Sequence, residues 1–225
     1  MANFGFSHLA VVAPYEPHWR EAKSAIGAED LLQNATSAER LAEAVAECTL
    51  VIGAASLASR KPEQPIVSLP DLGPHVRNEI ARGGRVALLF GPEKRGLTRD
   101  DLAFCHLLVE IPTHPRQPSM NLGQAVAVCL YELAARAEGS NSASQHDSES
   151  AVQPTDTAAA ATTADMDLLA EIIAETMRAA NYSPAAMRKA NRHDLDLLLR
   201  RLALTRCDAR RILGLFRRIL SGIKR

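Results

Sequence analysis

Two stretches of the chain combine glycine, proline and polar residues in the manner of ligand-binding loops. In the first, an apolar segment, 85–90, runs into Gly91 and a short turn, and a helix start with the capping pattern Thr98-x-x-Asp101 follows. In open α/β sheets, ligands bind outside the carboxyl ends of strands, where glycine lets backbone amides approach them. This stretch therefore predicts a ligand site built from backbone groups, and a plain strand-to-helix turn is the alternative.

The second stretch, Glu110–Val126, is a strand end, a proline-rich loop and the start of an apolar helix. Three prolines fall within seven residues: Pro112, Pro115 and Pro118. Proline fixes φ, so it lowers the cost of holding a loop in a ligand-lining conformation. Ser119 and Asn121 are polar groups suited to such a site, and each is equally explained as a helix N-cap.

Other features narrow the chemistry. His114 in the proline loop is a candidate general base, since an unperturbed imidazole titrates near neutral pH, and an exposed surface histidine is the alternative. Neither a G-x-G-x-x-G fingerprint nor a Walker motif occurs, so the sequence supports neither a dinucleotide nor a nucleoside triphosphate as ligand.

The elements that must position these loops alternate between strand and helix. Strands are predicted at four apolar segments: 8–13, 49–53, 85–90 and 106–111. Helices are predicted from the capping pattern Thr36-x-x-Glu39 to Cys48, after Thr98, and over 121–136. This order predicts an α/β domain over residues 1–136, with a parallel sheet covered by helices on both faces.

The rest of the chain divides into a linker and a helical domain. Residues 137–164 lack periodicity and large apolar side chains, so we expect a disordered linker. Residues 165–225 predict three helices, 165–180, 183–202 and 205–222, the last with the capping pattern Thr205-x-x-Asp208. The formal net charge is zero, yet this segment holds 13 of the 26 Lys and Arg residues. The asymmetry indicates an anionic partner for the helical domain.

Cysteine usage and hydropathy bear on the cellular compartment. The four cysteines are widely spaced without a C-x-x-C pair, which indicates reduced structural thiols and no metal site. No apolar run of about 18 residues occurs. We therefore expect a soluble, cytoplasmic protein without membrane contact.

In this order, the two loop stretches resemble signature motifs of the SpoU/TrmH class of SPOUT methyltransferases. The phrases F-G-P-E-x-x-G-L-T and I-P-T-x-P-x-x-x-S-x-N-L-x-Q-A-V…Y-E-L look most like the branch called TrmJ, which 2′-O-methylates the first nucleotide of the tRNA anticodon loop, a cytidine or uridine. Residues 1–14 resemble the end of the family's first motif, and residues 188–219 are similar to the branch's C-terminal helices. The resemblance implies a parallel sheet with a trefoil knot, S-adenosyl-L-methionine as cofactor, RNA as partner and a homodimer.

The resemblance also implies roles for individual residues. The catalytic positions would be Glu93, Ser119 and Asn121. Glu93 would orient RNA or a partner arginine, and the alternative is that it is simply an exposed carboxylate of the turn. The cofactor would contact eight residues: Ala54, Ala55, Ser56, Gly91, Ile111, Pro118, Ser119 and Met120. RNA phosphates would contact six arginines of the helical domain: Arg200, Arg201, Arg210, Arg211, Arg217 and Arg218.

One part of the family pattern has no counterpart. The family's first strand and its Asn-x-Gly…Arg motif should precede the Phe4-Gly-Phe-Ser stretch, and the missing arginine is the residue expected near the 2′-hydroxyl. Arg60 is a candidate substitute, although its spacing differs. We therefore expect an N-terminally truncated fold, either because the start is assigned at an internal methionine of a longer enzyme or because the chain is a shortened paralogue. The alternatives are a non-catalytic RNA-binding or dimerisation paralogue, or a related enzyme acting on ribosomal RNA.

Overall fold

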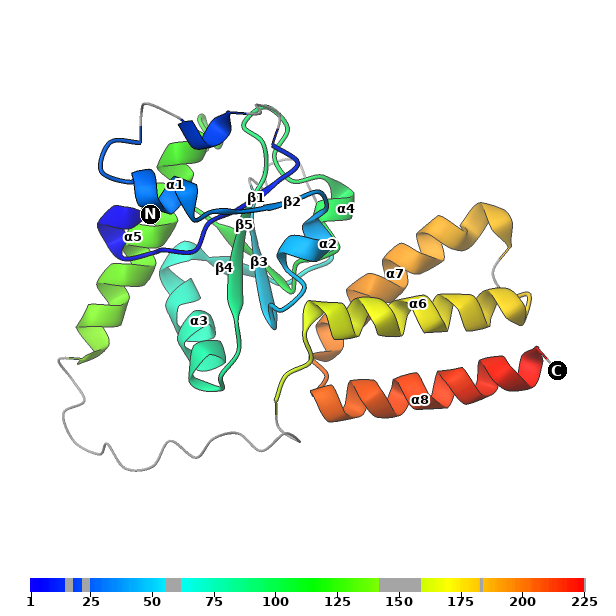
Figure 1. Ribbon diagram of the computed structural model, residues 1–225. Coiled ribbons are helices and arrows are strands. Elements are labelled where there is room, and N and C mark those ends of the chain that lie inside the picture. The colour runs from blue at the N-terminus through cyan, green and yellow to red at the C-terminus, as the bar shows by residue number, and fades with distance from the viewer. Residues whose placement is uncertain (15–17, 22–24, 56–61, 142–158, 183, 225) are drawn as a thin grey trace.

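The structure is a computed structural model that describes residues 1–14, 18–21, 25–55, 62–141, 159–182 and 184–224. An α/β part, residues 1–141, lies beside a helical part, residues 159–224 (Figure 1). In chain order the elements are η1 (Ala2–Phe4), β1 (Ala10–Val12), η2 (Trp19–Glu21), α1 (Glu29–Gln33), β2 (Thr36–Ala38), α2 (Leu41–Ala44), β3 (Leu50–Ala54), β4 (Ile66–Ser68), η3 (Leu69–Asp71), α3 (Leu72–Ala81), β5 (Val86–Phe90), α4 (Arg99–Leu102), β6 (Leu107–Glu110), α5 (Leu122–Asn141), α6 (Thr163–Ala179), η4 (Ala185–Met187), α7 (Arg188–Leu202) and α8 (Arg206–Ile223).

The main sheet has four strands in the order β4-β6-β3-β5, and every pairing is parallel. Strand β3 lies between β5 and β6, with Leu50 opposite Val86 and Ile52 opposite Leu107. Val51 and Ile52 point to opposite faces of the sheet and are both fully buried. Burial on both faces explains why this strand reads as a continuous apolar run, and it confirms the predicted parallel α/β architecture.

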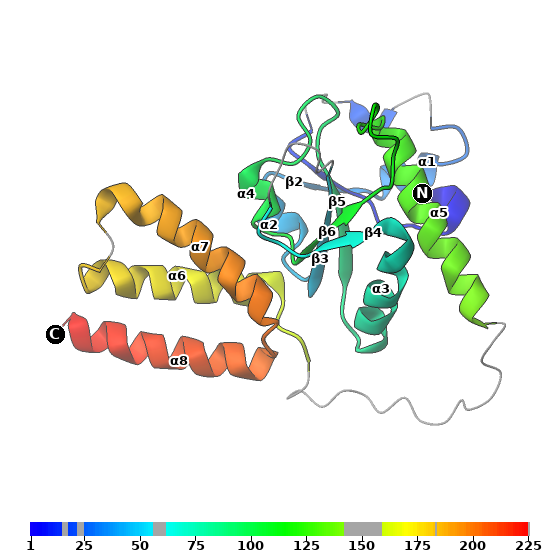
Figure 2. The same ribbon diagram turned by 180° about the vertical axis from the view of Figure 1, so that it is seen from behind.

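Helices cover both faces of this sheet. On one face, Leu72 of α3 and Cys129 of α5 pack against Ile52 and Val109. On the other, Leu102 of α4 packs with Val51 and its neighbours. Helices α3 and α5 lie on the side away from the helical part, while α2 and α4 lie between the sheet and α6–α8 (Figure 2).

One predicted element needs correction, and one strand was missed. The capping box at Thr36 and Glu39 is wrong, because Thr36–Ala38 forms β2, which pairs in parallel with β1. Helix α2 begins later, and the Glu43 carboxylate accepts the backbone amide of Arg40. Strand β4 was not predicted: it has three residues and lies at the sheet edge, where Ile66 stays 49% exposed. So short an apolar run carries no clear period.

The helical part is a small bundle in which α6 contacts both α7 and α8. Its core includes Met166, Leu169 and Leu199. The Thr205 hydroxyl accepts the amide of Asp208, which confirms the predicted cap of the last helix. Thr162 makes the same contact with Asp165 at the start of α6.

Helical or buried residues occupy both ends of the range predicted as a linker, 137–164. Helix α5 continues to Asn141, and Ala161 is 5% exposed in the core of the helical part. The start of α6 is also hydrogen-bonded to the α/β part. The Thr163 amide and hydroxyl both donate to the Cys48 carbonyl, at 2.9 and 3.0 Å. The Ala164 amide donates to the Ala46 carbonyl at 2.9 Å. Main-chain contacts thus join the two parts.

All four cysteines are free thiols, as expected from their spacing. Burial raises the pKa of Cys129 to about 11 and that of Cys105, with a smaller contribution from Asp101, to about 12. Both are therefore protonated at neutral pH and act as apolar core groups. Within the described ranges, no helix has the length and apolar character needed to cross a membrane.

Candidate functional site

The loops that follow β3, β5 and β6 leave the sheet at the same edge. The last residue of β3, Ala54, lies opposite Phe90 of β5 and Val109 of β6. The amide of Ala55 donates to the Val109 carbonyl at 3.4 Å, so the chain after β3 stays close to β6. Because all three strands are parallel, the two motif loops meet at this carboxyl edge, as the sequence predicts.

The loop after β5 is a tight turn that only glycine permits. A Cβ atom on Gly91 would lie 2.2 Å from the carbonyl carbon of Gly96 and 2.3 Å from the Leu97 amide nitrogen. The Gly96 amide donates to the Pro92 carbonyl at 2.7 Å, and the φ of Gly96 is +62°. Two glycines thus fold the loop back onto itself and leave Glu93 exposed on its outer side.

A direct hydrogen bond joins the two motif loops. The Asn121 side-chain amide donates to a carboxylate oxygen of Glu93. The Asn121 carbonyl oxygen accepts the Gln124 amide at 3.2 Å and so caps the first turn of α5. The N-cap interpretation of Asn121 is therefore right, but the same side chain also fixes the Glu93 carboxylate.

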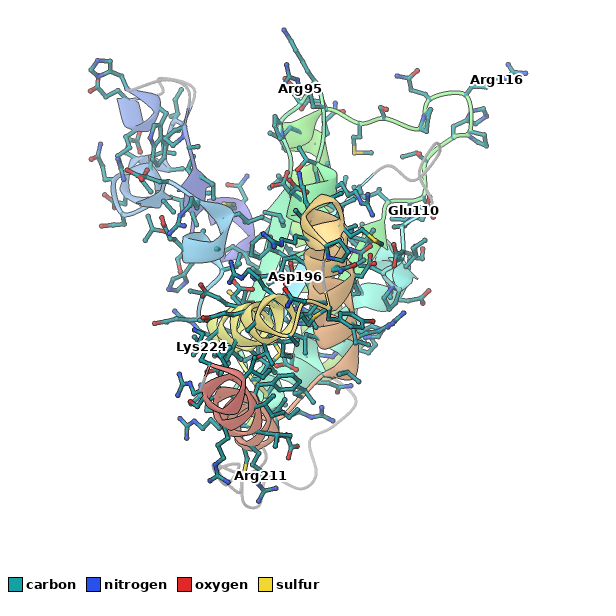
Figure 3. The ribbon with its side chains drawn as sticks, turned by 90° about the vertical axis from the view of Figure 1, so that its right-hand side faces the viewer. Arg95, Glu110, Arg116, Asp196, Arg211 and Lys224 are labelled. Carbon is teal, nitrogen blue, oxygen red and sulfur yellow. The ribbon has the colours of Figure 1, made fainter. Side chains whose placement is uncertain are left out.

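The proline loop, residues 111–121, is held by its own contacts. The Arg116 amide donates to His114 Nδ1 at 3.2 Å, and the Gln117 amide donates to the His114 carbonyl at 2.8 Å. The loop stands out from the body of the protein, with Arg116 near its tip (Figure 3). His114 is exposed, and its Nδ1 is occupied within the loop, which favours the surface interpretation over a general base.

The predicted cofactor-binding residues fall into three groups. Ala54, Ala55, Gly91, Ile111 and Met120 are half-buried, and Ile111 packs against the core under the sheet edge. Pro118 and Ser119 are exposed on the loop. Ser56 and Arg60 lie outside the described residues. The described groups form an apolar, backbone-lined edge, with the Glu93 carboxylate beside it. No three His, Cys, Asp or Glu side chains in the described ranges are placed to hold a metal ion.

Five of the six predicted RNA-binding arginines are exposed: Arg201, Arg210, Arg211, Arg217 and Arg218. Arg200 needs correction, because it is only 5% exposed. Its Nη2 donates to Asp167 Oδ1 at 2.6 Å, and its guanidinium lies over the Phe104 ring, 5.9 Å from the centroid. A side chain enclosed in this way contacts the α/β part instead of an external phosphate.

The buried guanidinium of Arg200 affects its neighbours. Burial lowers the pKa of His106 to about 4, with Arg200 contributing, and the neutral ring accepts the Val51 amide at 3.0 Å. Burial raises the pKa of Asp167 above its usual range, although Arg200 acts in the opposite direction. The Arg200 Nε and Nη1 atoms are buried without a hydrogen-bond partner.

Further contacts between the two parts were not predicted. The Arg99 Nε donates to His193 Nε2 at 3.1 Å, and Lys189 pairs with Asp100 at 3.5 Å. Through these two contacts, the first turns of α7 lie beside α4, the helix that follows the Gly91 turn. These residues are about 90 positions apart in the chain, and a single sequence carries no signal that would pair them.

Comparison with known proteins agrees with this geometry. A family model described as "SpoU rRNA Methylase family" matches residues 1–131, more than half of the chain. The chain belongs to this family. The match ends within α5, so it spans both motif loops of the carboxyl edge.

Curated relatives similar to this chain are named for tRNA. The Yersinia enterocolitica "tRNA (cytidine/uridine-2'-O-)-methyltransferase TrmJ" is 38% identical over 134 residues, which is 59% of this chain and 51% of that protein. The Pseudomonas aeruginosa "tRNA (cytidine/uridine/adenosine-2'-O-)-methyltransferase TrmJ" is 36% identical over 134 residues, which is 52% of that protein. The chain thus spans about half the length of the curated relatives it matches.

The crystal structure of TrmJ from Z. mobilis ZM4 has the same fold. It superimposes with a TM-score of 0.78 at 24% sequence identity, over the whole of this chain and 90% of that one. The α/β architecture with parallel sheets is therefore shared with that protein.

Proposed function

We propose that this chain is an S-adenosyl-L-methionine-dependent RNA 2′-O-ribose methyltransferase whose substrate is tRNA. The observation that carries the proposal is the Glu93–Asn121 hydrogen bond, which joins the two family motifs at the carboxyl edge of the sheet. Membership of the SpoU family and the names of the relatives support the reaction type. In the proposal, residues 1–136 are the methyltransferase domain and residues 165–225 the RNA-binding domain, joined by the linker.

The described residues fit an S-adenosyl-L-methionine site. The half-buried edge formed by Ala54, Ala55 and Ile111 suits an apolar ring, and backbone groups around Gly91 suit its polar edges. Met120 is half-buried at the start of α5, and Pro118 and Ser119 would close the site from the loop. In the proposal the loops around this edge form the trefoil knot of the family.

Bound there, the cofactor supplies a methyl group that its sulfonium already activates. Methylation of a ribose 2′-oxygen would also require an acceptor for the hydroxyl proton, which a carboxylate or solvent can supply. The chain must therefore align three atoms and orient the hydroxyl. Asn121 holds the Glu93 carboxylate at this edge, where it can accept a hydrogen bond from the hydroxyl or from an orienting arginine. Ser119 would stand on the same side of the loop.

The exposed arginines of the helical part would hold the RNA. Arg210, Arg211, Arg217 and Arg218 all lie on α8, where they can neutralise phosphates and make binding depend steeply on salt. We place the reaction at the first nucleotide of the anticodon loop, a cytidine or uridine, in a cytoplasmic homodimer. Light scattering of the purified chain tests the dimer.

Two experiments on the full chain test the proposal. Calorimetric titration with S-adenosyl-L-methionine should show saturable binding that the Gly91→Val substitution abolishes, because no Cβ fits at this position. Transfer of a labelled methyl group to tRNA should follow, and tRNA already methylated at the 2′-oxygen should accept none. No binding by the folded wild-type chain would refute the cofactor assignment.

Two alternative functions can be tested in the same assays. The family description names ribosomal RNA, so ribosomal RNA transcripts belong in the same transfer assay, and preferential labelling of them would overturn the tRNA assignment. Cofactor and RNA binding without any methyl transfer would favour a non-catalytic RNA-binding protein.

A further inference from the structure

A groove between α6 and α7 has the composition of an anion site. It has a volume of about 250 Å³ and is lined by Ala174, Met177 and Arg178 of α6, and by Arg188, Asn191 and Arg192 of α7, with Glu171 and Leu195 at its inner end. Residues spaced by three and four lie on one face of a helix, so both helices direct these side chains into the same space. Three guanidinium groups and one amide face a single carboxylate there.

One arginine of the groove takes part in an ion pair with a residue outside the lining. The Nε of Arg192 donates to Asp196 Oδ1 at 2.9 Å. A guanidinium has five N–H donors in a planar fork, so one such contact leaves others directed elsewhere. Arg178 and Arg188 are exposed at the outer end. Planar guanidinium forks match the oxygen geometry of a phosphate, so this outer end suits a phosphate better than a cation or an apolar group.

The adjoining cavity shows by contrast why the anion belongs in the outer groove. This cavity, about 320 Å³, lies between α4 and the helical part and shares Glu171 and Arg192 with the groove. Its other charged residues are Asp167, Asp196 and Arg200, so three carboxylates face two arginines. The excess of negative charge disfavours an anion there, whereas the groove has an excess of two positive charges.

The position of the groove connects it to the proposed reaction site. On α7, Lys189 and His193 contact Asp100 and Arg99 of α4, and the next positions around the helix line the groove. Helix α4 directly follows the Gly91 turn. In Figure 3, Arg95 lies at the upper end of the view, Asp196 of α7 lies near the centre, and Arg211 of α8 lies at the opposite end. An RNA strand that leaves the carboxyl edge along α4 therefore meets α7 before α8.

We propose that the α6–α7 groove binds a backbone phosphate of the RNA substrate through Arg178, Arg188 and Arg192. The inference rests on the proposed function for the identity of the RNA, but the phosphate site itself can be tested without it. The sequence did not single out these three arginines, because only the pairing of α6 with α7 brings them together.

The first experiment titrates inorganic phosphate into the full chain by calorimetry at constant ionic strength. The double variant Arg178→Gln/Arg188→Gln should lose saturable binding. A matched control, Arg77→Gln/Arg82→Gln, removes two exposed arginines at α3 on the far side of the sheet and should bind like wild type. Circular dichroism checks folding, and Arg178→Lys/Arg188→Lys, which retains charge, should regain part of the affinity. Wild-type binding by the glutamine variant would overturn the site.

The second experiment measures tRNA affinity against potassium chloride concentration for the same proteins. The groove variant should bind about tenfold more weakly, as loss of a charge-assisted contact implies. The slope of log affinity against log salt should fall by about 1, as for one phosphate contact. If phosphate binding is lost but tRNA binding is unchanged, the groove takes a free phosphate and the RNA assignment is wrong. If phosphate binds at the groove but no form binds tRNA, the proposed function fails and the phosphate site remains.

Discussion

Replacing Arg200 by methionine should destabilise the protein, although this arginine was expected on an RNA-binding surface. The Arg200 side chain is 4% exposed, and its partner Asp167 is 29% exposed. Removing one member of a fully buried ion pair costs about 3–5 kcal/mol, because the other charge is left without compensation. Since Asp167 keeps partial contact with water, we expect Arg200→Met to lower the free energy of unfolding by roughly 2–3 kcal/mol.

The double variant Arg200→Met/Asp167→Leu should recover most of this loss. The Nε and Nη1 atoms of Arg200 are buried without partners, so the native pair already carries an uncompensated desolvation cost. Replacement of both charges by apolar groups of similar volume removes that cost, and we expect stability within about 1 kcal/mol of wild type.

Urea unfolding followed by far-UV circular dichroism measures both variants, and a cycle with Asp167→Leu alone isolates the pair. Arg201→Met, on the exposed neighbour, is the matched control and should change stability by less than about 0.5 kcal/mol. A single variant as stable as wild type would refute the structural role of Arg200. A double variant no better than the single would refute the reasoning about its unpaired nitrogens.

Three further predictions concern single positions. Gly53→Ala should cost about 1–3 kcal/mol in urea unfolding, because a Cβ would lie 2.7 Å from Cys105 Sγ in the packed core. Asn121→Ala should cost about 1 kcal/mol as a lost cap, and it should lower the methyl-transfer rate more than cofactor affinity, because Glu93 loses its anchor. His106 has its pKa lowered to about 4 from a usual 6.5, so as pH falls between these values only the unfolded chain binds a proton and stability declines. His106→Gln should remove about 2–3 kcal/mol of this decline, measured by urea unfolding from pH 7 to pH 4.

Each of these has a control and a contrary outcome. Gly214→Ala, where nothing lies within 4 Å, should not destabilise, and an equal loss at both glycines would refute the packing argument for Gly53. Asn78→Ala, on the exposed side of α3, is the control for Asn121→Ala. A wild-type transfer rate in Asn121→Ala would refute the role of Asn121. His75→Gln, also exposed, should keep the full pH dependence, and an unchanged pH profile in His106→Gln would contradict the lowered pKa.

The sequence predicted the elements that are buried on both faces or that begin with a cap. Strands β3 and β5 are apolar throughout and β6 is apolar up to its last residue, Glu110, while Thr98 and Thr205 are paired with acids three residues later. The pattern at Thr36 and Glu39 looked the same, yet pairing with β1 made Thr36–Ala38 a strand. Local capping is worth about 1 kcal/mol, so a tertiary pairing can override it.

The candidate site was predictable where it follows from strand order and motif. The meeting of the Gly91 turn with the proline loop follows from parallel strands, but the link from Asn121 to Glu93 does not, since it depends on side-chain direction. The role of Arg200 could not be predicted either. Basic residues on a helix indicate a charged face, and only the docking of α6–α8 onto α4 decides which arginine is enclosed.

The hydrogen bonds between α6 and the α/β part have a consequence for how this chain tolerates sequence change. These contacts run from the amides of Thr163 and Ala164 to the carbonyls of Cys48 and Ala46, so most substitutions at these four positions leave the donors and acceptors in place. The side chains of Ala46 and Ala164 can change while these contacts are retained, whereas Thr163 is fully buried and its hydroxyl also donates to Cys48. Proline is the exception: at position 163, the first residue of α6, it suits the helix and yet removes the amide that reaches Cys48. A single substitution can thus weaken the junction of the two parts while leaving their other contacts in place.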